Sequence, residues 1–206
     1  MTVPRLLVLT DRAQAGDAGH GLAQVVEAAF RAGAPAVVLR ERDLPAEQRR
    51  RVAAHLSARA RSHGARLLVA GDVGLATAVG AAGVHLAAGD PMPALGGLLV
   101  GRSCHDQPEV AAARAEGGDY ASVSPVASTR SKPGYGPALG ADGLAALVDA
   151  ADGMPVIALG GVTVDTLPTW LAVGAHGVAV MGAVMSSPTP ERVVEALLTA
   201  LDKETS

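Results

Sequence analysis

The sequence predicts a single (β/α)8 barrel, also called a TIM barrel. Three observations carry this prediction: short continuous apolar runs recur along the chain, longer segments of helical pattern lie between them, and several of those segments end at a glycine. Continuous apolar runs are typical of parallel strands buried on both faces. Eight such runs, each followed by a helix or a helix-like connection, supply the eight units that close a barrel of this class.

The predicted strands are short, and their apolar residues are mainly Val, Leu and Ala. Aromatic residues make up only 2% of the chain, so the core must be built from these aliphatic side chains. The predicted strands are Arg5–Asp11, Ala36–Glu41, Arg66–Gly71, Gly83–Ala87, Leu98–Ser103, Asp119–Val126, Pro155–Gly161 and Gly177–Gly182.

Helical patterns follow several of these strands. The clearest cover residues 21–33, 45–64, 107–118 and 189–204. Glycines in a left-handed conformation commonly end helices, which predicts stops at Gly33, Gly64, Gly117 and Gly174. The last helix is expected to begin with Thr189 as its cap and Pro190 in its first turn.

The fourth unit fits the repeat least well, because "GDPMPALGG" leaves little room for a helix. An open, doubly wound sheet is the alternative fold. No strong boundary divides the chain, so we expect one domain over residues 1–206.

Composition limits the classes of function. A net charge of -3 argues against nucleic acid as the main partner, since phosphate backbones require a basic face. The single cysteine, Cys104, fits a reducing cytoplasm. No segment reaches the ~18 apolar residues of a membrane span, so we expect a cytoplasmic protein with no membrane partner. A homodimer is an expectation by analogy alone.

Polar side chains gather after the predicted strands, where barrels of this class place their chemistry. A ring of salt bridges that joins the strands is the alternative interpretation of Arg40 and Glu41. The polar residues at these ends are Thr10, Asp11, Arg40, Glu41, Arg42, Asp43, Asp72, His85, Asp90, Arg102, Ser103, His105, Ser122 and Ser124.

Two further features predict a phosphate site. The seventh and eighth strands end in "ALGG" and "VMGA", and glycines there allow an anion to approach backbone N–H groups. The long polar segment Ser128–Gly140 offers hydroxyls and Lys132, and we expect it to cover a phosphorylated ligand. A flexible linker is the alternative interpretation of this segment.

These motifs together resemble the family of thiamine-phosphate synthases and TenI proteins. The resemblance rests on "VVLRERD", "AAGVHL", "VGRSCHD", "DYASVSPVASTRSKPGYGPALG", "PVIALGGV" and "GVAVMGAV", and it covers nearly the whole chain. It implies the same barrel fold. It also implies one of two activities: a Mg²⁺-assisted synthase that joins a pyrimidine diphosphate to a thiazole phosphate and releases pyrophosphate, or a thiazole tautomerase.

The resemblance also implies roles for particular residues. Arg40 would grip the diphosphate, with Arg42 in place of the usual Lys, and Ser103 would contact the leaving diphosphate or an ionised pyrimidine intermediate. Lys132 would neutralise the departing pyrophosphate, whose growing charge favours fixed cations and donors. The thiazole-phosphate side would be formed by Thr129, Arg130, Ser131, Gly160, Gly161, Met181 and Gly182.

The chain departs from the family pattern on the pyrimidine and metal side. Val38 replaces a Gln, and Ala70 and Gly71 replace an Asn-Asp pair whose Asp would bind Mg²⁺. Asp72 is one residue away and is expected to point elsewhere. Asp90 remains as the one candidate Mg²⁺ ligand, and it could hold the ion together with substrate phosphates because Mg²⁺ keeps several waters.

Three functions stay open at this point. The leading one is a thiamine-phosphate synthase; the others are a thiazole tautomerase and a non-catalytic binder of thiazole phosphate or thiamine phosphate. The His that tautomerases carry near the end of the sixth strand is Pro125 here. His85, Glu41 or His105 would then have to supply acid–base chemistry, although each also has a structural interpretation.

Overall fold

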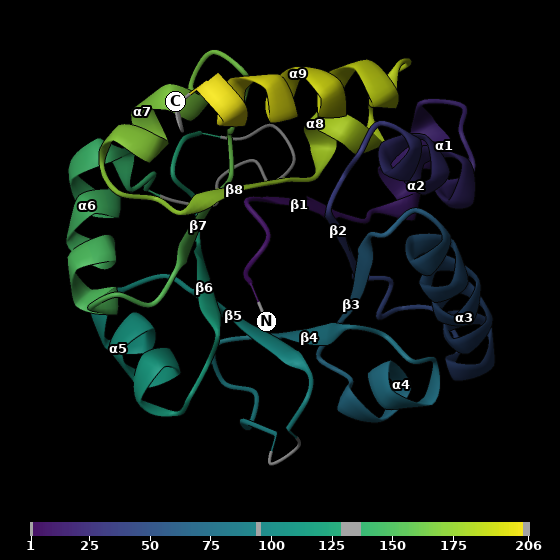
Figure 1. Cartoon of the computed structure of the whole chain (residues 1–206), viewed down its shortest axis with the longest axis horizontal. Coiled ribbons are helices and arrows are strands. Elements are labelled where there is room, and N and C mark those ends of the chain that lie inside the picture. The colour runs from purple at the N-terminus through teal and green to yellow at the C-terminus, as the bar shows by residue number, and fades with distance from the viewer. Residues whose placement is uncertain (1, 94–95, 129–136, 204–206) are drawn as a thin grey trace.

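The computed structural model describes residues 2–93, 96–128 and 137–203. Its eight parallel strands pair in chain order and close between the first and the last into a barrel, with the helices outside the ring (Figure 1). The strands are β1 (Leu6–Leu9), β2 (Ala36–Leu39), β3 (Arg66–Ala70), β4 (Gly83–Leu86), β5 (Leu99–Cys104), β6 (Tyr120–Val123), β7 (Val156–Leu159) and β8 (Gly177–Val180). The prediction of a (β/α)8 barrel is therefore confirmed.

The helices include several that the sequence patterns did not indicate. The longest are α3 and α9, and three of the short ones, α1, α4 and α8, begin within three residues of the end of a strand. The helices are α1 (Arg12–Asp17), α2 (Leu22–Arg31), α3 (Ala46–Ser62), α4 (Val73–Ala78), α5 (Gln107–Ala115), α6 (Gly140–Ala151), α7 (Leu167–Ala172), α8 (Gly182–Met185) and α9 (Pro190–Lys203). The described residues between β4 and β5 contain no helix, as the composition of that connection predicts.

The predicted glycine stops and the position of Pro190 are confirmed. The four glycines expected to stop helices all have positive φ angles, between +67° and +95°. Pro190 is the first residue of α9, and the Thr189 carbonyl accepts the N–H of Arg192 at 3.1 Å. Most of the predicted strands, by contrast, run too far at their carboxyl ends. The residues at those ends, such as Asp11 and Arg40, have left the sheet to cap a helix or to face a pocket.

Two apolar clusters hold the barrel together. The larger fills the layer between the strands and the helices, and the smaller fills the barrel interior. Successive side chains of a strand point to opposite faces, so alternate residues of each strand enter the interior. Tyr120 occupies the interior without any exposed surface, and Gly101 on the neighbouring strand makes room for it: a Cβ at Gly101 would overlap the Tyr120 ring.

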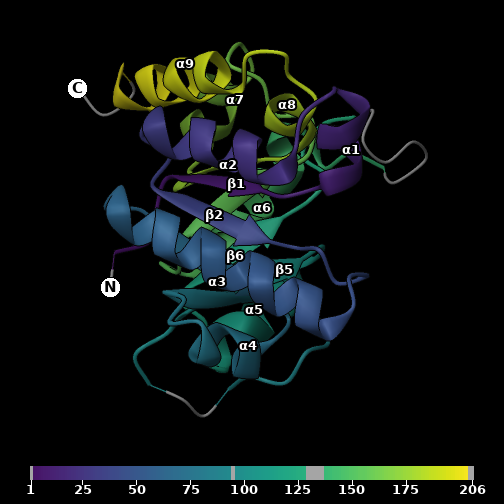
Figure 2. The same ribbon diagram turned by 90° about the vertical axis from the view of Figure 1, so that its right-hand side faces the viewer.

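The amino-terminal segment lies at the far end of the barrel from the strand tips. Figure 2 shows the N-terminus on the opposite side from the point of the β2 arrow. Val3 packs against the interior cluster there, and its carbonyl oxygen lies 3.0 Å from His176 Nε2. This end is thus filled by the chain itself, whereas the carboxyl ends of the strands surround a pocket. No described helix is long and apolar enough to cross a membrane.

Candidate active site

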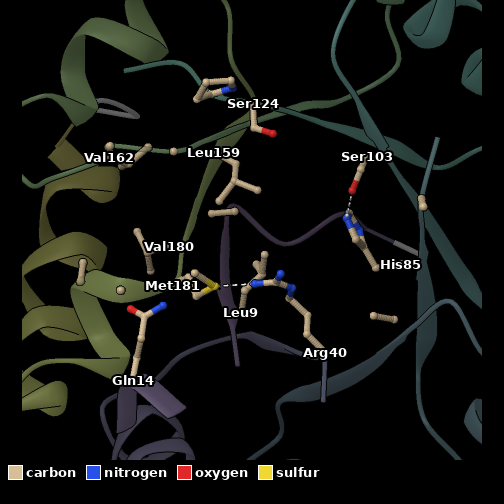
Figure 3. Close-up of a pocket in the computed structure, with 18 of the residues that line it drawn as sticks. Leu9, Gln14, Arg40, His85, Ser103, Ser124, Leu159, Val162, Val180 and Met181 are labelled. Atoms are coloured by element: carbon tan, nitrogen blue, oxygen red, sulfur yellow. Dashed lines mark hydrogen bonds between the residues drawn. The ribbon is translucent and has the colours of Figure 1, made fainter. Parts of the chain in front are cut away.

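The carboxyl ends of the strands surround a pocket of about 1110 Å³. Its lining follows from the alternation along each strand, because residues two positions beyond an interior side chain face the pocket. Arg40 thus follows Val38, and Ser103 follows Gly101 (Figure 3). Those predicted polar residues that line the pocket are Arg40, Arg42, Asp43, His85, Ser103, His105 and Ser124.

The other predicted polar residues lie outside this pocket. Arg102 points away from the interior, where its guanidinium contacts Glu116 at 2.8 Å. Asp72 caps α4 by accepting the N–H of Leu75 at 2.8 Å, and its second oxygen pairs with Arg49 at 3.0 Å. Asp72 is thus engaged in structure, as its displacement from the family position predicts. Ser122 is buried beneath the pocket floor.

Glu41 is a rim residue that joins two connections. Its carboxylate is buried and accepts from the backbone and the guanidinium of Arg12 at 3.2 and 3.0 Å. Arg12 also forms a bidentate pair with Asp43, and the two carboxylates raise the pKa of Arg12. For Glu41 the salt-bridge interpretation therefore fits better than acid–base chemistry.

Two arginines of the loop after β2 project into the pocket. The Arg40 backbone N–H donates to Thr10 Oγ1 at 2.9 Å, which fixes the start of this loop. The Arg40 guanidinium contacts Met181 Sδ across the pocket (Figure 3), and no carboxylate of the described chain lies within ion-pair distance of it. Arg42 is half-exposed and lies 3.6 Å from Asp90. Both cations are therefore available to an anionic ligand.

His85 lies between the barrel interior and the pocket. Its Nδ1 is 2.9 Å from the Tyr120 hydroxyl, and its Nε2 is 3.0 Å from Ser103 Oγ and 3.2 Å from Ser122 Oγ. Burial, together with the charges of Arg40 and Arg42, lowers the pKa of His85 to about 4. The imidazole is therefore neutral at pH 7 and holds the Ser103 hydroxyl at the pocket wall.

His105 also lines the pocket but is held by its surroundings. Its Nδ1 lies 2.9 Å from the Ser124 carbonyl oxygen, and its backbone N–H donates to Glu109 at 2.7 Å. These contacts fit the structural interpretation of His105.

Tyr120 was missed by sequence reasoning, although its spacing of two from Ser122 on one strand could have indicated a shared face.

The glycine turns after β7 and β8 form the opposite wall. Gly160 and Gly161 have φ angles of +95° and +68°, and a Cβ at Gly161 would lie 2.6 Å from the Ser128 carbonyl oxygen. Both line the pocket with Met181 and Gly182, where α8 begins. The first N–H groups of a helix have no partner within it, so this wall offers backbone donors to an anion.

The predicted residues Thr129, Arg130, Ser131 and Lys132 lie outside the described residues. The chain on either side of them is fixed at the pocket rim. Ala127 N–H donates to the Gly160 carbonyl at 3.0 Å, and Gly140 N–H donates to the Val126 carbonyl at 3.1 Å. The roles expected for the four residues stay predictions.

The metal corner does not fit a protein-bound Mg²⁺ ion. Mg²⁺ keeps several waters and is usually bound through one or two carboxylates together with substrate phosphates. The described residues contain no group of three or more His, Cys, Asp or Glu side chains that could hold a metal, so this corner depends on Asp90. Asp90 already accepts the Ala87 N–H at 2.8 Å and lies beside the Arg42 guanidinium. A divalent cation at this carboxylate would therefore be adjacent to a second positive charge.

Sequence reasoning also missed Gln14, which enters the pocket from α1. Its amide donates to Asp11 at 2.9 Å and accepts from Ser186 at 3.2 Å, so it joins the first and last connections of the rim. α1 is too short for a periodic pattern, but Asp11 followed three residues later by Gln14 matches the signature of a helix start, and this signal was present in the sequence. The apolar side chains of Leu9 and Leu159 line the same pocket.

The fold and the pocket define a (β/α)8-barrel protein with a polar, partly cationic pocket at the carboxyl ends of its strands. A model of the family described as thiamine monophosphate synthase matches residues 6–184. The chain belongs to this family.

Relatives in sequence and in structure agree. A putative thiamine-phosphate synthase of Geobacter sulfurreducens is 42% identical over 97% of this chain and 95% of its own. A thiamine-phosphate synthase of Roseiflexus castenholzii is 36% identical over 92% of this chain and 85% of its own. A thiamine phosphate pyrophosphorylase from Pyrococcus furiosus matches in structure with a TM-score of 0.84 and 27% identity, covering 98% of this chain and 97% of its own.

Proposed function

We propose that the protein is a thiamine-phosphate synthase, a transferase that joins hydroxymethylpyrimidine diphosphate to thiazole phosphate and releases pyrophosphate. The observation that carries this proposal is that two kinds of group suited to anions line one pocket. Arg40 and Arg42 form one wall, the glycine turns at Gly160 and Gly182 form the other, and the contact of Arg40 with Met181 joins the two. A single phosphate would need only one of these walls.

The two walls suit the two substrates. The cationic wall would take the diphosphate of the pyrimidine, and the glycine wall would take the phosphate of the thiazole. The bond between the pyrimidine methylene carbon and the diphosphate oxygen breaks, and the thiazole nitrogen forms the new bond to that carbon. Negative charge grows on the departing diphosphate, so the fixed guanidiniums stabilise the transition state more than the ground state.

Ser103 has a defined part in this scheme. His85 is neutral and contacts Ser103 Oγ at 3.0 Å, so the hydroxyl is held at the wall of the pocket that Arg40 and Arg42 also line. The Ser103 hydroxyl would donate to the leaving diphosphate or contact the pyrimidine.

Two further statements belong to the same proposal: the protein is located in the cytoplasm, and it binds both phosphorylated heterocycles.

The test is an assay with both substrates, with and without Mg²⁺, that measures thiamine phosphate and pyrophosphate. We expect the two products in equal amounts, and we expect Arg40→Ala to lower kcat/KM by about 100-fold because it removes a charge-assisted contact to the leaving group. Arg51→Ala, an exposed arginine that pairs with Glu47, is the matched control and should be unchanged.

Two other outcomes would replace this proposal. Conversion of the non-aromatic thiazole phosphate to its aromatic isomer, without the pyrimidine, would assign a tautomerase. The loss of the family's metal-binding Asp at Gly71 favours this second candidate, whereas the lowered pKa of His85 makes that imidazole a weak base at pH 7. Tight binding of thiamine phosphate without turnover of any substrate would assign a ligand-binding protein.

A further inference from the structure

The side chain of Arg42 occupies the space above Gly71. Gly71 has a φ of +63°, and a Cβ built there would overlap the Arg42 guanidinium. No side chain can therefore stand at position 71 while Arg42 keeps this conformation. The position that carries a carboxylate in the family pattern is filled here by a positive charge.

The neighbouring carboxylate is already engaged. One oxygen of Asp90 accepts the Ala87 N–H at 2.8 Å and lies 3.6 Å from Arg42 Nη2. The backbone carbonyl of Asp90 accepts from Arg102 at 2.6 Å, which fixes the residue from the outer side of the barrel. Asp90 thus positions Arg42 over Gly71.

Arg40 is the cation of this corner without a carboxylate partner among the described residues. Arg42 pairs with Asp90, and Arg12 pairs with Glu41 and Asp43, whereas both Arg40 and Arg42 act on the same imidazole, His85. A guanidinium presents a planar set of donors that matches two oxygens of a phosphate group. Two guanidiniums can therefore bind the oxygens of a diphosphate and offset part of its charge without a metal.

We propose that the Arg42 guanidinium, seated over Gly71 and held by Asp90, takes the place of a protein-bound divalent cation, so that this pocket binds a diphosphate group directly. This inference rests on the proposed function only for the identity of the ligand that carries the diphosphate. Gly71 leaves open the space that the Arg42 guanidinium occupies, so a side chain at position 71 would require Arg42 to move.

Inorganic pyrophosphate is the probe, and isothermal titration calorimetry is the measurement. We expect the affinity in EDTA to equal or exceed the affinity in excess Mg²⁺. We expect Arg42→Ala to weaken binding in EDTA by about tenfold or more, since it removes a charge-assisted contact. Arg50→Ala, an exposed arginine paired with Glu47, is the matched control and should bind as the parent does. Melting temperatures verify that each variant is folded.

A charge swap at the same corner gives a second, independent measurement. Gly71→Asp alone should displace Arg42 and lose metal-free binding by about tenfold or more. Asp adopts a positive φ more readily than most residues, so the variant can fold. The double variant Gly71→Asp/Arg42→Ala places two carboxylates at the corner and removes the cation, and its pyrophosphate binding should require Mg²⁺.

Binding that is seen only with Mg²⁺ in the parent protein, or unchanged affinity in Arg42→Ala, would overturn the inference. Absence of pyrophosphate binding under both conditions would overturn it as well. The titration needs no turnover, so metal-free binding in a protein that forms no thiamine phosphate would defeat the proposed function alone. Product formation in a protein that binds pyrophosphate only with Mg²⁺ would defeat this inference alone.

Discussion

Single residues inside the barrel are fixed by steric fit, and Gly101 is the clearest case. Its missing side chain is the space that the Tyr120 ring fills. We expect Gly101→Ala to lower the free energy of unfolding by about 1–3 kcal/mol or more, because the interior has no room to relax. Urea denaturation followed by circular dichroism measures the change. Gly96→Ala, where a Cβ meets nothing within 4 Å, is the control, and equal effects in the two variants would contradict this reading.

His85 predicts a pH dependence of stability. Its pKa is lowered from 6.5 to about 4 in the folded protein, mainly by burial. The unfolded chain therefore binds more protons between these values, and stability is lost as the pH falls from about 6.5 toward 4. From pH 7 to pH 5 the contribution of His85 should fall by about 2 kcal/mol.

The measurement is the free energy of unfolding of the parent protein and of His85→Gln at a series of pH values. The difference between them isolates His85, because the other titrating groups are common to both. The parent should lose more stability than the variant on acidification. Parallel pH curves would show that the imidazole is not held neutral in the folded state.

Among the helices and strands, Asp72 after β3 stabilises the start of a helix. Asp72 caps α4 and also pairs with Arg49, whose side chain is only 11% exposed. Asp106 caps α5 in the same way, and the described structure shows no ion pair for it. We expect Asp72→Ala to destabilise by about 2–4 kcal/mol and Asp106→Ala by about 1 kcal/mol. Thermal unfolding compares the two, and a larger effect at Asp106 would contradict the structural assignment.

Strands and long helices could be predicted because each has a repeating pattern or a stop signal. The apolar runs identified all eight strands, although the first was predicted to Asp11 and ends at Leu9. The short helices α1, α4 and α8 were missed, since four to six residues are too few to show a period. Asp11 and Asp72 cap two of them, and this signal was present in the sequence.

The arrangement of the strands in the whole barrel explains which residues of the site could be predicted. Strand alternation places Arg40 and Ser103 in the pocket, and the same rule would have placed Arg102 outside it. The contact of Arg42 with Asp90 could not be predicted, because it joins loops of separate units whose conformations no local pattern specifies. The barrel thus determines which face carries the chemistry, while the loops determine its details.

The separation of framework from rim predicts that stability and ligand binding can be changed independently. α9 closes the molecule against α2, and Leu197 on its buried face is 1% exposed. We expect Leu197→Ala to lower the free energy of unfolding by about 2–5 kcal/mol, because a cavity remains where the side chain packed. Its pyrophosphate affinity, measured well below the melting temperature, should equal that of the parent.

Two further variants serve as controls. Glu195→Ala, on the exposed face of the same helix, should alter stability by no more than about 0.5 kcal/mol. Arg42→Ala should show the reverse of Leu197→Ala, with weakened binding and nearly unchanged stability, since its guanidinium is half-exposed at the rim. A Leu197→Ala protein that is folded but binds pyrophosphate about tenfold more weakly would show that the helix shell and the pocket rim are coupled rather than independent.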